Sequence, residues 1–307
     1  RHIRCLRWWY RMIVRRMGFS IHLSLPIEIP VLNFSMKHLT LIPIGGLGNR
    51  IFAIASAIAY CAAQQCRLRI VWFRDWGMGA QFRELFELEG KVRDVEVVDA
   101  QWRDYIYDRP RRRNLWIPYL YQRFAFDKRL YEQKIYREGS GIILPSLQNA
   151  RNAYLVFWAE LPTVSYNLDC LRLTAPLAKQ VFDRTNAFPT NTIGIHIRRT
   201  DNIRSIQNSP LSLFIEKMRG ELKVHPDTKF YVASDSLHEK QELVHHFPDK
   251  IITVWKETDR SSRQGIEDAL VELYSLAATR KIFGSVGSSY SILAGRIGGI
   301  PVEIVSK

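Results

Sequence analysis

The second half of the chain alternates short apolar runs with amphipathic stretches, and no other feature restricts the possible folds as much. The apolar runs, each long enough for a buried strand, lie at residues 192–197, 229–234, 250–255, 281–285 and 301–305. The amphipathic stretches, each with helical spacing, lie at residues 210–224, 236–247, 264–279 and 288–298. Strands that alternate with helices in this way build βαβ units on a parallel sheet. The pattern therefore predicts an α/β fold for this half.

The first half carries a weaker version of the same pattern. A strand candidate at Leu39–Ile44 leads into a glycine-rich turn and then into an alanine-rich helix over residues 51–63. Further strand candidates lie at residues 69–73, 93–98 and 153–158. The stretch 161–190 contains three prolines and looks like a connection. We therefore expect an N-terminal extension and two domains, at residues 1–35, 36–165 and 166–307.

The turn after the first strand candidate contains Gly45, Gly46, Gly48 and Asn49. Glycine lets the backbone turn tightly or approach a ligand closely. Asn49 is placed either to cap the following helix or to bond a sugar hydroxyl. The spacing differs from the dinucleotide fingerprint G-x-G-x-x-G, because Ile51 stands in the place of its last glycine. Alone, the turn is weak evidence for a particular ligand.

A cationic motif stands where the apolar run of residues 192–197 ends, and reads His196-Ile197-Arg198-Arg199-Thr200-Asp201. Arginine suits phosphate because its planar fork offers several donors and keeps its charge. Two arginines in succession suggest a diphosphate. The alternative is that Arg198 and Arg199 form a solvated strand end or pair with Asp201 for structural reasons.

Other polar residues follow neighbouring strand candidates, and the carboxyl ends of parallel strands meet at one crevice. Asp235 is suited to accept hydrogen bonds from the ring N–H and exocyclic amine of guanine, or to cap the helix that begins near Leu237. Three serines lie before or at the start of the last helix, where free N–H groups and hydroxyls attract phosphate oxygens: Ser285, Ser288 and Ser289. A simple connection between strand and helix is the alternative for these serines.

Together these segments resemble a known superfamily, the GDP-fucose-dependent fucosyltransferases, which includes the α-1,6 and nodulation-factor enzymes and the α-1,2 and protein O-fucosyltransferases. Its hallmark H-x-R-R-x-D is matched by His196, Arg198, Arg199 and Asp201. The segments 230–235 and 284–290 follow in the expected order, and the turn 45–50 resembles the first loop of the family. The resemblance covers residues 36–305 and implies a GT-B-like fold, with two Rossmann-like domains facing a cleft.

The resemblance also implies a reaction, the direct and inverting transfer of fucose from GDP-fucose to a glycan or lipid-linked oligosaccharide. The catalytic residues would be Arg198, Arg199 and Asp201. The donor would be bound by His196, Arg198, Asp235, Ser285, Ser288 and Ser289, and the loop Gly45, Gly46, Gly48 and Asn49 would lie beside it. No D-x-D element is present, so we expect no metal and no cofactor, and cationic side chains would stabilise the departing diphosphate.

The chain departs from its α-1,6 relatives after the motif. Those enzymes carry a Lys and then a Glu, the proposed base, where this chain has Asn202 and Ile206. The departure puts the linkage and the base in doubt, and leaves Asp201 as a weak candidate for the base. The alternatives to fucosyl transfer are a GT-B enzyme with another nucleotide sugar and a non-catalytic protein that binds nucleic acid or a membrane surface.

Composition indicates an acidic partner without identifying it. The net charge of +14 suits a nucleotide donor, an anionic membrane or nucleic acid. The resemblance favours the nucleotide donor, and we expect no nucleic-acid partner. Residues 1–35 carry six Arg and one Glu. Five of the arginines recur at three- and four-residue steps, typical of a basic amphipathic helix on an inner membrane leaflet: Arg1, Arg4, Arg7, Arg11 and Arg15. The alternative is an upstream extension, because Met36 looks like a natural start. Four cysteines without metal-ligand spacing make the cytoplasm the default location.

The stretch 102–137 interleaves aromatic and basic residues densely. Aromatic faces stack on sugar rings, so we expect part of the acceptor pocket here. Most of these side chains are expected to pack in the core or on a domain surface. A nucleic-acid interpretation of the same stretch is the alternative.

Overall fold

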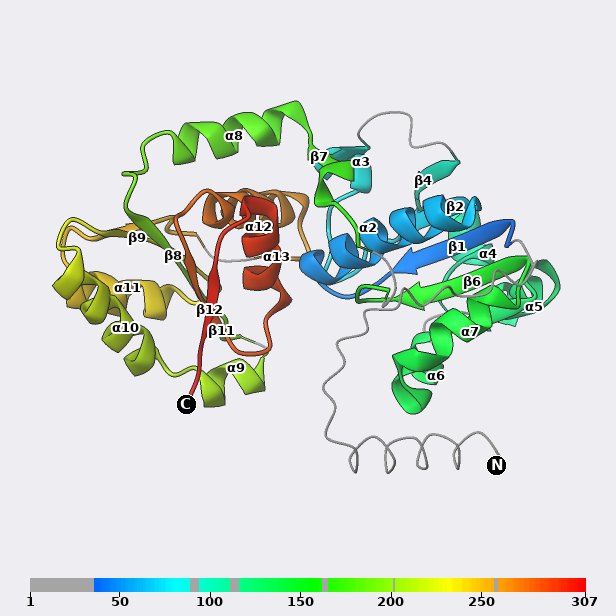
Figure 1. Cartoon of the computed structure of the whole chain (residues 1–307). Helices are drawn as coiled ribbons and strands as arrows, with labels where there is room; N and C mark the ends of the chain where they lie inside the picture. The colour runs from blue at the N-terminus through cyan, green and yellow to red at the C-terminus, as the bar shows by residue number, and fades with distance from the viewer. Residues whose placement is uncertain (1–35, 89–93, 111–115, 162–164, 201, 257–258) are drawn as a thin grey trace, which may run out of the picture. The chain divides into compact units, whose positions relative to one another are not determined.

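The structure, a computed structural model, describes residues 36–307 apart from residues 89–93, 111–115, 162–164, 201 and 257–258. The expected N-terminal extension and Asp201 of the cationic motif lie outside the described residues. Two five-stranded parallel sheets form the framework of the described part (Figure 1). They confirm the predicted α/β, GT-B-like fold class with two Rossmann-like units.

The first sheet has the strand order β4-β2-β1-β6-β5. Its strands are β1 (His38–Pro43), β2 (Arg67–Trp72), β4 (Val95–Asp99), β5 (Lys128–Leu130) and β6 (Asn152–Phe157). The second sheet has the order β10-β9-β8-β11-β12. Its strands are β8 (Thr192–Ile197), β9 (Lys229–Ser234), β10 (Ile251–Thr253), β11 (Ile282–Ser285) and β12 (Val302–Val305). A separate antiparallel pair consists of β3 (Phe86–Leu88) and β7 (Leu171–Leu173).

Helices connect these strands in both halves. In the first half they are α2 (Leu47–Gln64), α3 (Phe82–Leu85), α4 (Trp102–Tyr107), α5 (Trp116–Ala125), α6 (Glu132–Glu138) and α7 (Ile143–Gln148). In the second half they are α8 (Ala175–Thr185), α9 (Ile203–Asn208), α10 (Leu211–Val224), α11 (Leu237–His246), α12 (Arg263–Ala277) and α13 (Ser289–Gly298). The described residues also include the 3₁₀ turns η2 (Ser140–Ile142) and η3 (Leu168–Cys170). None of these described helices is long and apolar enough to cross a bilayer.

The central strands of the second sheet, β9, β8 and β11, are buried on both faces, which explains their near-continuous apolar sequences. All six residues of β8 are buried. Helix α12 packs against α8 and α13, and it contributes the fully buried side chains of Leu270, Leu273 and Leu276 to the core. The helical spacing of these leucines is the signal that predicts α12.

The strand order places a topological switch point at β8. From β8 the chain continues into β9 on one side, and it later returns as β11 on the other side. Loops that leave the carboxyl ends of β8 and β11 diverge there, which opens a crevice where ligands bind in α/β folds. The predicted motif residues follow β8 directly.

Three local expectations need correction. Helix α2 begins at Leu47, so Asn49 lies within its first turn and does not cap it; the N-cap is Gly46, which makes no side-chain bond. Helix α11 is capped by Ser236 and not by Asp235, because the Ser236 hydroxyl accepts the Glu239 N–H at 3.4 Å. The stretch expected as a plain connection contains η3, β7 and α8.

Candidate active site

A cavity of about 520 Å³ lies at the switch point of the second sheet. Its wall includes His196 and Arg198 from the end of β8, Asp235 after β9, and residues 288–290 at the start of α13. Residues 46–49 at the start of α2 complete it from the first half of the chain. The sequence therefore predicted the main segments that surround this cavity.

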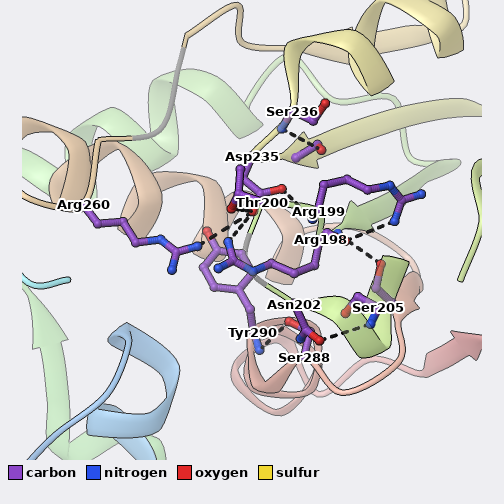
Figure 2. A network of polar contacts seen from close by, with 12 residues as sticks. Arg198, Arg199, Thr200, Asn202, Ser205, Asp235, Ser236, Arg260, Ser288 and Tyr290 are labelled. Atoms are coloured by element: carbon purple, nitrogen blue, oxygen red, sulfur yellow. Dashed lines mark hydrogen bonds and ion pairs between the residues drawn. The ribbon is translucent and has the colours of Figure 1, made fainter. Parts of the chain in front are cut away.

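Asp235 is the centre of a polar network at the cavity wall (Figure 2). Its carboxylate accepts hydrogen bonds from the Arg198 guanidinium, from the Arg199 N–H at 2.8 Å and from the Thr200 hydroxyl at 2.7 Å. The Arg260 guanidinium lies 3.9 Å from the same carboxylate. Because the Asp235 side chain is only 6% exposed, this network fixes the direction of Arg198 toward the cavity.

The two adjacent arginines have separate roles. Arg199 turns away from the cavity lining and donates to a Glu239 oxygen at 2.5 Å and to the Ser209 carbonyl at 3.1 Å. Both side chains of this ion pair are largely buried. Arg199 thus holds α11 and the loop after α9 in place, as the structural alternative anticipated, although its partner is Glu239 and Asp201 lies outside the described residues.

His196 presents an unsatisfied polar atom in the wall of the cavity. Its Nδ1 is buried and has no hydrogen-bond partner, and its ring stacks on Tyr290 with centroids 4.8 Å apart. Buried polar atoms without a partner are rare and are often completed by a ligand. Burial lowers the pKa of His196 to about 4, so the imidazole is neutral near pH 7 and able to donate or accept one hydrogen bond.

The depressed pKa of His196 predicts a loss of stability in acid. An unfolded histidine takes up its proton near pH 6.5 and the folded one only near pH 4, so the unfolded state binds more protons between these values. The free energy of unfolding attributable to His196 is therefore complete above pH 6.5. It falls by about 3 kcal/mol as the pH approaches 4. Urea unfolding across this range measures it.

The matched control for this pH dependence is His196→Gln, which keeps hydrogen-bonding capacity and does not titrate. We expect the acid loss of stability to shrink by the His196 contribution in this variant. An identical pH profile for both proteins would show that His196 is protonated equally well in the folded and unfolded states.

The serines of the predicted donor site divide into two kinds. Ser285 is fully buried and joins the two strand ends, since its hydroxyl accepts the Arg198 N–H at 3.1 Å and donates to the His196 carbonyl at 3.3 Å. Ser288 and Ser289 line the cavity. Ser288 caps α13 at the Tyr290 N–H, and the Ser289 hydroxyl donates to the Asn49 side-chain oxygen at 2.9 Å. Their role in binding a donor stays a prediction.

Asn202 has a structural role that explains its place after the motif. Its side-chain oxygen caps α9 by accepting the Ser205 N–H at 3.1 Å, while its amide donates to the Gly287 carbonyl at 3.1 Å. These two bonds tie the loop after β8 to the loop after β11. A lysine at this position would form neither the cap nor the same bridge.

The glycine turn supports a prediction on stability. Gly45 has a φ of +85°, and a Cβ there would lie 2.9 Å from the Asn49 amide nitrogen. Gly45→Ala should therefore reduce the free energy of unfolding by about 1–2 kcal/mol. Gly46→Ser is the control, because a Cβ at Gly46 meets nothing within 4 Å and serine is a better N-cap. Equal thermal stability of the two variants would contradict this account of the turn.

A second cavity of about 480 Å³ shares Gly46, Gly77 and Arg260 with the first. Its lining includes Tyr105 and Arg109 from the aromatic and basic stretch of the sequence, together with the exposed indole of Trp76. The expectation that this stretch packs mainly against protein holds for Phe126 and Tyr131, while several other aromatic side chains are exposed.

Sequence reasoning missed several residues of the site. Arg50 is fully buried and donates to Gly45 O at 2.9 Å, Phe73 O at 2.7 Å and Asp75 at 2.8 Å, which fixes the glycine turn to the end of β2. Arg260 lines both cavities from a loop without any motif. The place of Arg50 directly after the glycine turn was a sequence signal from which its role in fixing that turn could have been predicted. For Arg260, only the folded structure brings it to Asp235.

Among the described residues, no group of three or more His, Cys, Asp or Glu side chains is arranged to hold a metal ion. The arginines that line the first cavity are Arg198, Arg204 and Arg260. Metal independence itself stays a prediction.

Comparisons with known proteins place the fold. No family model matches the chain, and no curated protein matches it either. The structure is similar to a NodZ α-1,6-fucosyltransferase soaked with GDP-fucose, with 16% identity, a TM-score of 0.58, and coverage of 85% of this chain and 92% of that one. The fucosyltransferase NodZ from Bradyrhizobium is similar as well, with 17% identity, a TM-score of 0.57, and coverage of 84% of this chain and 92% of that one.

POFUT1 in complex with GDP is also similar, with 12% identity, a TM-score of 0.54, and coverage of 88% of this chain and 98% of that one. At such identities the likeness is one of fold. The chain has the GT-B-like fold of these fucosyltransferase structures over most of its length.

Proposed function

We propose that the chain is a glycosyltransferase that transfers fucose from GDP-fucose to a glycan or lipid-linked oligosaccharide. The observation that carries the proposal is the position of Arg198. Asp235 holds this partly buried guanidinium at the carboxyl end of β8, in a cavity whose wall includes the start of α13. A fixed arginine beside a helix N-terminus suits a diphosphate in charge and in geometry.

The proposed reaction is a direct displacement at the anomeric carbon. The bond between fucose C1 and the β-phosphate oxygen breaks, and its electron pair leaves with GDP. The acceptor oxygen bonds to C1 from the opposite face, so the configuration inverts, and its proton passes to a base. Arg198 and the N–H groups at the start of α13 would stabilise the charge on the departing diphosphate, and no metal would be required.

The guanine of the nucleotide-sugar donor would bind through His196 and Asp235. The unpartnered Nδ1 of His196 is available to a nucleobase. Asp235 already accepts three hydrogen bonds, and a carboxylate has room for about four, so one contact to guanine remains feasible. Of the predicted donor serines, Ser288 and Ser289 would lie at the diphosphate end, and Ser285 would act through its bonds to the end of β8. Asp201 stays the weak candidate for the catalytic base that accepts the proton of the acceptor hydroxyl.

The acceptor would occupy the second cavity, beside the first. Trp76 and Tyr105 offer faces for a sugar ring, and both residues line this cavity. A cytoplasmic location with peripheral contact of residues 1–35 to an anionic membrane belongs to the same proposal, and would bring a lipid-linked acceptor within reach.

The experiment that tests the proposed activity is release of GDP from GDP-fucose, followed with GDP-mannose and UDP-glucose as competing donors. We expect turnover with GDP-fucose in the presence of EDTA, and stimulation by acceptor glycans. Preference for another nucleotide sugar would contradict the fucose assignment and retain the fold. Absence of turnover with every donor, in a protein whose affinity for nucleic acid falls steeply with salt, would support the non-catalytic alternative.

A further inference from the structure

Helix α5 presents its apolar residues to solvent. Ile117, Leu120, Tyr121 and Phe124 recur at the three- and four-residue steps of one helix face, and all four are exposed. Phe124 is the extreme case, with 87% of its surface accessible. Tyr107 of α4 extends this surface, because its ring lies 4.8 Å from that of Tyr121 and is also exposed. These five residues are called the α5 surface below.

The opposite face of α5 is buried and is held by one polar side chain. Gln122 is fully buried; its amide donates to the Tyr107 carbonyl at 2.9 Å and to the Arg109 carbonyl at 3.2 Å, and its oxygen accepts the Tyr131 hydroxyl at 2.6 Å. A rotation of α5 that buried Phe124 would break all three bonds and leave a buried amide unpaired. The exposure of the apolar face is therefore built into the packing of the helix.

The charges around the α5 surface point to an anionic occupant. Arg123 of α5, Arg103 of α4 and Lys128 just after α5 are exposed, and the described part of α5 contains no carboxylate. Asp127 is exposed as well, but its carboxylate accepts the N–H groups of Arg151 and Asn152 at 3.0 and 2.9 Å. A second copy of the chain would bring the same cations face to face in a symmetric contact. Residues 1–35 carry a net charge of +5 and would be repelled as well. Tyrosine and phenylalanine flanked by arginine are typical of helices that lie in a membrane interface.

We propose that the α5 surface docks on an anionic lipid bilayer, with Phe124, Leu120 and Ile117 inserted among the acyl chains and Arg123 among the headgroups. The contact is separate from the one expected for residues 1–35. Tyr105 and Arg109, which line the second cavity, lie on the same short segment of chain as Tyr107. Docking would thus hold that cavity close to the bilayer.

Flotation of the full chain with vesicles of phosphatidylcholine, with and without phosphatidylglycerol, tests the proposal without any donor or acceptor. We expect binding to the anionic vesicles, and a reduction of about tenfold in partitioning for Phe124→Ser, as partial burial of one phenylalanine provides. Phe182→Ser is the matched control, because Phe182 is 63% exposed on α8. Residues 1–35 are the same in every variant, so a difference reports on the α5 surface.

A second pair of variants tests the electrostatic contribution to vesicle binding. Arg123→Gln should weaken binding to anionic vesicles about fivefold and leave binding to neutral ones unchanged. Arg219→Gln, at an exposed position of α10, should change neither. Equal partitioning of wild type and Phe124→Ser would overturn the proposal. A dimer of the chain that dissociates in Phe124→Ser, with flotation unchanged, would also overturn it. So would binding of an acidic protein that depends on Phe124, if binding to vesicles does not depend on it. None of these outcomes depends on the donor assignment.

Discussion

Arg198→Ala should lower the turnover of GDP-fucose by about 10³-fold, the largest effect on activity that we expect from a single substitution. The Arg198 guanidinium pairs with Asp235 and lines the first cavity. Its loss would remove a donor placed where the departing diphosphate gains charge. Arg198→Lys keeps the charge and loses the planar fork, so we expect an intermediate turnover. Steady-state kinetics with GDP-fucose measures both.

Arg199→Ala is the informative comparison, because the neighbouring guanidinium binds Glu239 and the Ser209 carbonyl instead of facing the cavity. We expect it to reduce folding yield and thermal stability more than Arg198→Ala does. The residual stability of Arg198→Ala should be high, since Asp235 keeps its bonds to the Arg199 N–H and to Thr200. If Arg199→Ala folded normally and lost turnover while Arg198→Ala kept it, the assignment of the two arginines would be reversed.

Arg50→Met should reduce the free energy of unfolding by about 4 kcal/mol, the largest stability effect that we expect. The Arg50 side chain is fully inaccessible, pairs with Asp75 at 2.8 Å and lies over the Trp72 ring at 4.8 Å. Methionine fills the space but leaves two backbone carbonyls without the Arg50 donor and takes the paired cation from Asp75, which keeps the Gly77 N–H at 2.9 Å. Denaturant unfolding measures the change.

The control is Arg67→Met at the start of β2, where an ion pair with Asp94 at 3.5 Å is exposed to solvent. We expect a change within about 0.5 kcal/mol there. The double variant Arg50→Met with Asp75→Asn should recover part of the loss, because it removes the uncompensated charge. Similar losses for Arg50→Met and Arg67→Met would refute the claim that burial makes the first pair important.

The regular elements of the second half follow from the sequence because their apolar periodicity is strong. Residues 192–197 and 229–234 became β8 and β9 with the expected bounds. The short strand β5 escaped prediction, since Lys128–Leu130 is three residues long and two of them are cationic. Helix caps also escaped, because Ser236 and Asp235 are both good capping residues and only the backbone path decides between them.

The candidate site was predictable as a set of segments and not as a network. Chain topology brings the ends of β8 and β9 together, which predicts that Arg198 and Asp235 are neighbours. That Asp235 binds both Arg198 and the Arg199 backbone depends on side-chain rotamers that no local pattern encodes. Arg260 reaches Asp235 from a loop between β10 and α12, and such long-range contacts leave no periodic signal in the sequence.

The most direct test of the central claim is calorimetric titration of the full chain with GDP in the presence of EDTA, alongside Arg198→Ala and Arg219→Ala. Arg219 is exposed on α10, so its variant controls for the loss of one positive charge. We predict one GDP per chain, bound without metal, with affinity retained in Arg219→Ala and strongly reduced in Arg198→Ala. A folded protein that binds no GDP, or that loses equal affinity in both variants, would contradict a nucleotide site built on Arg198.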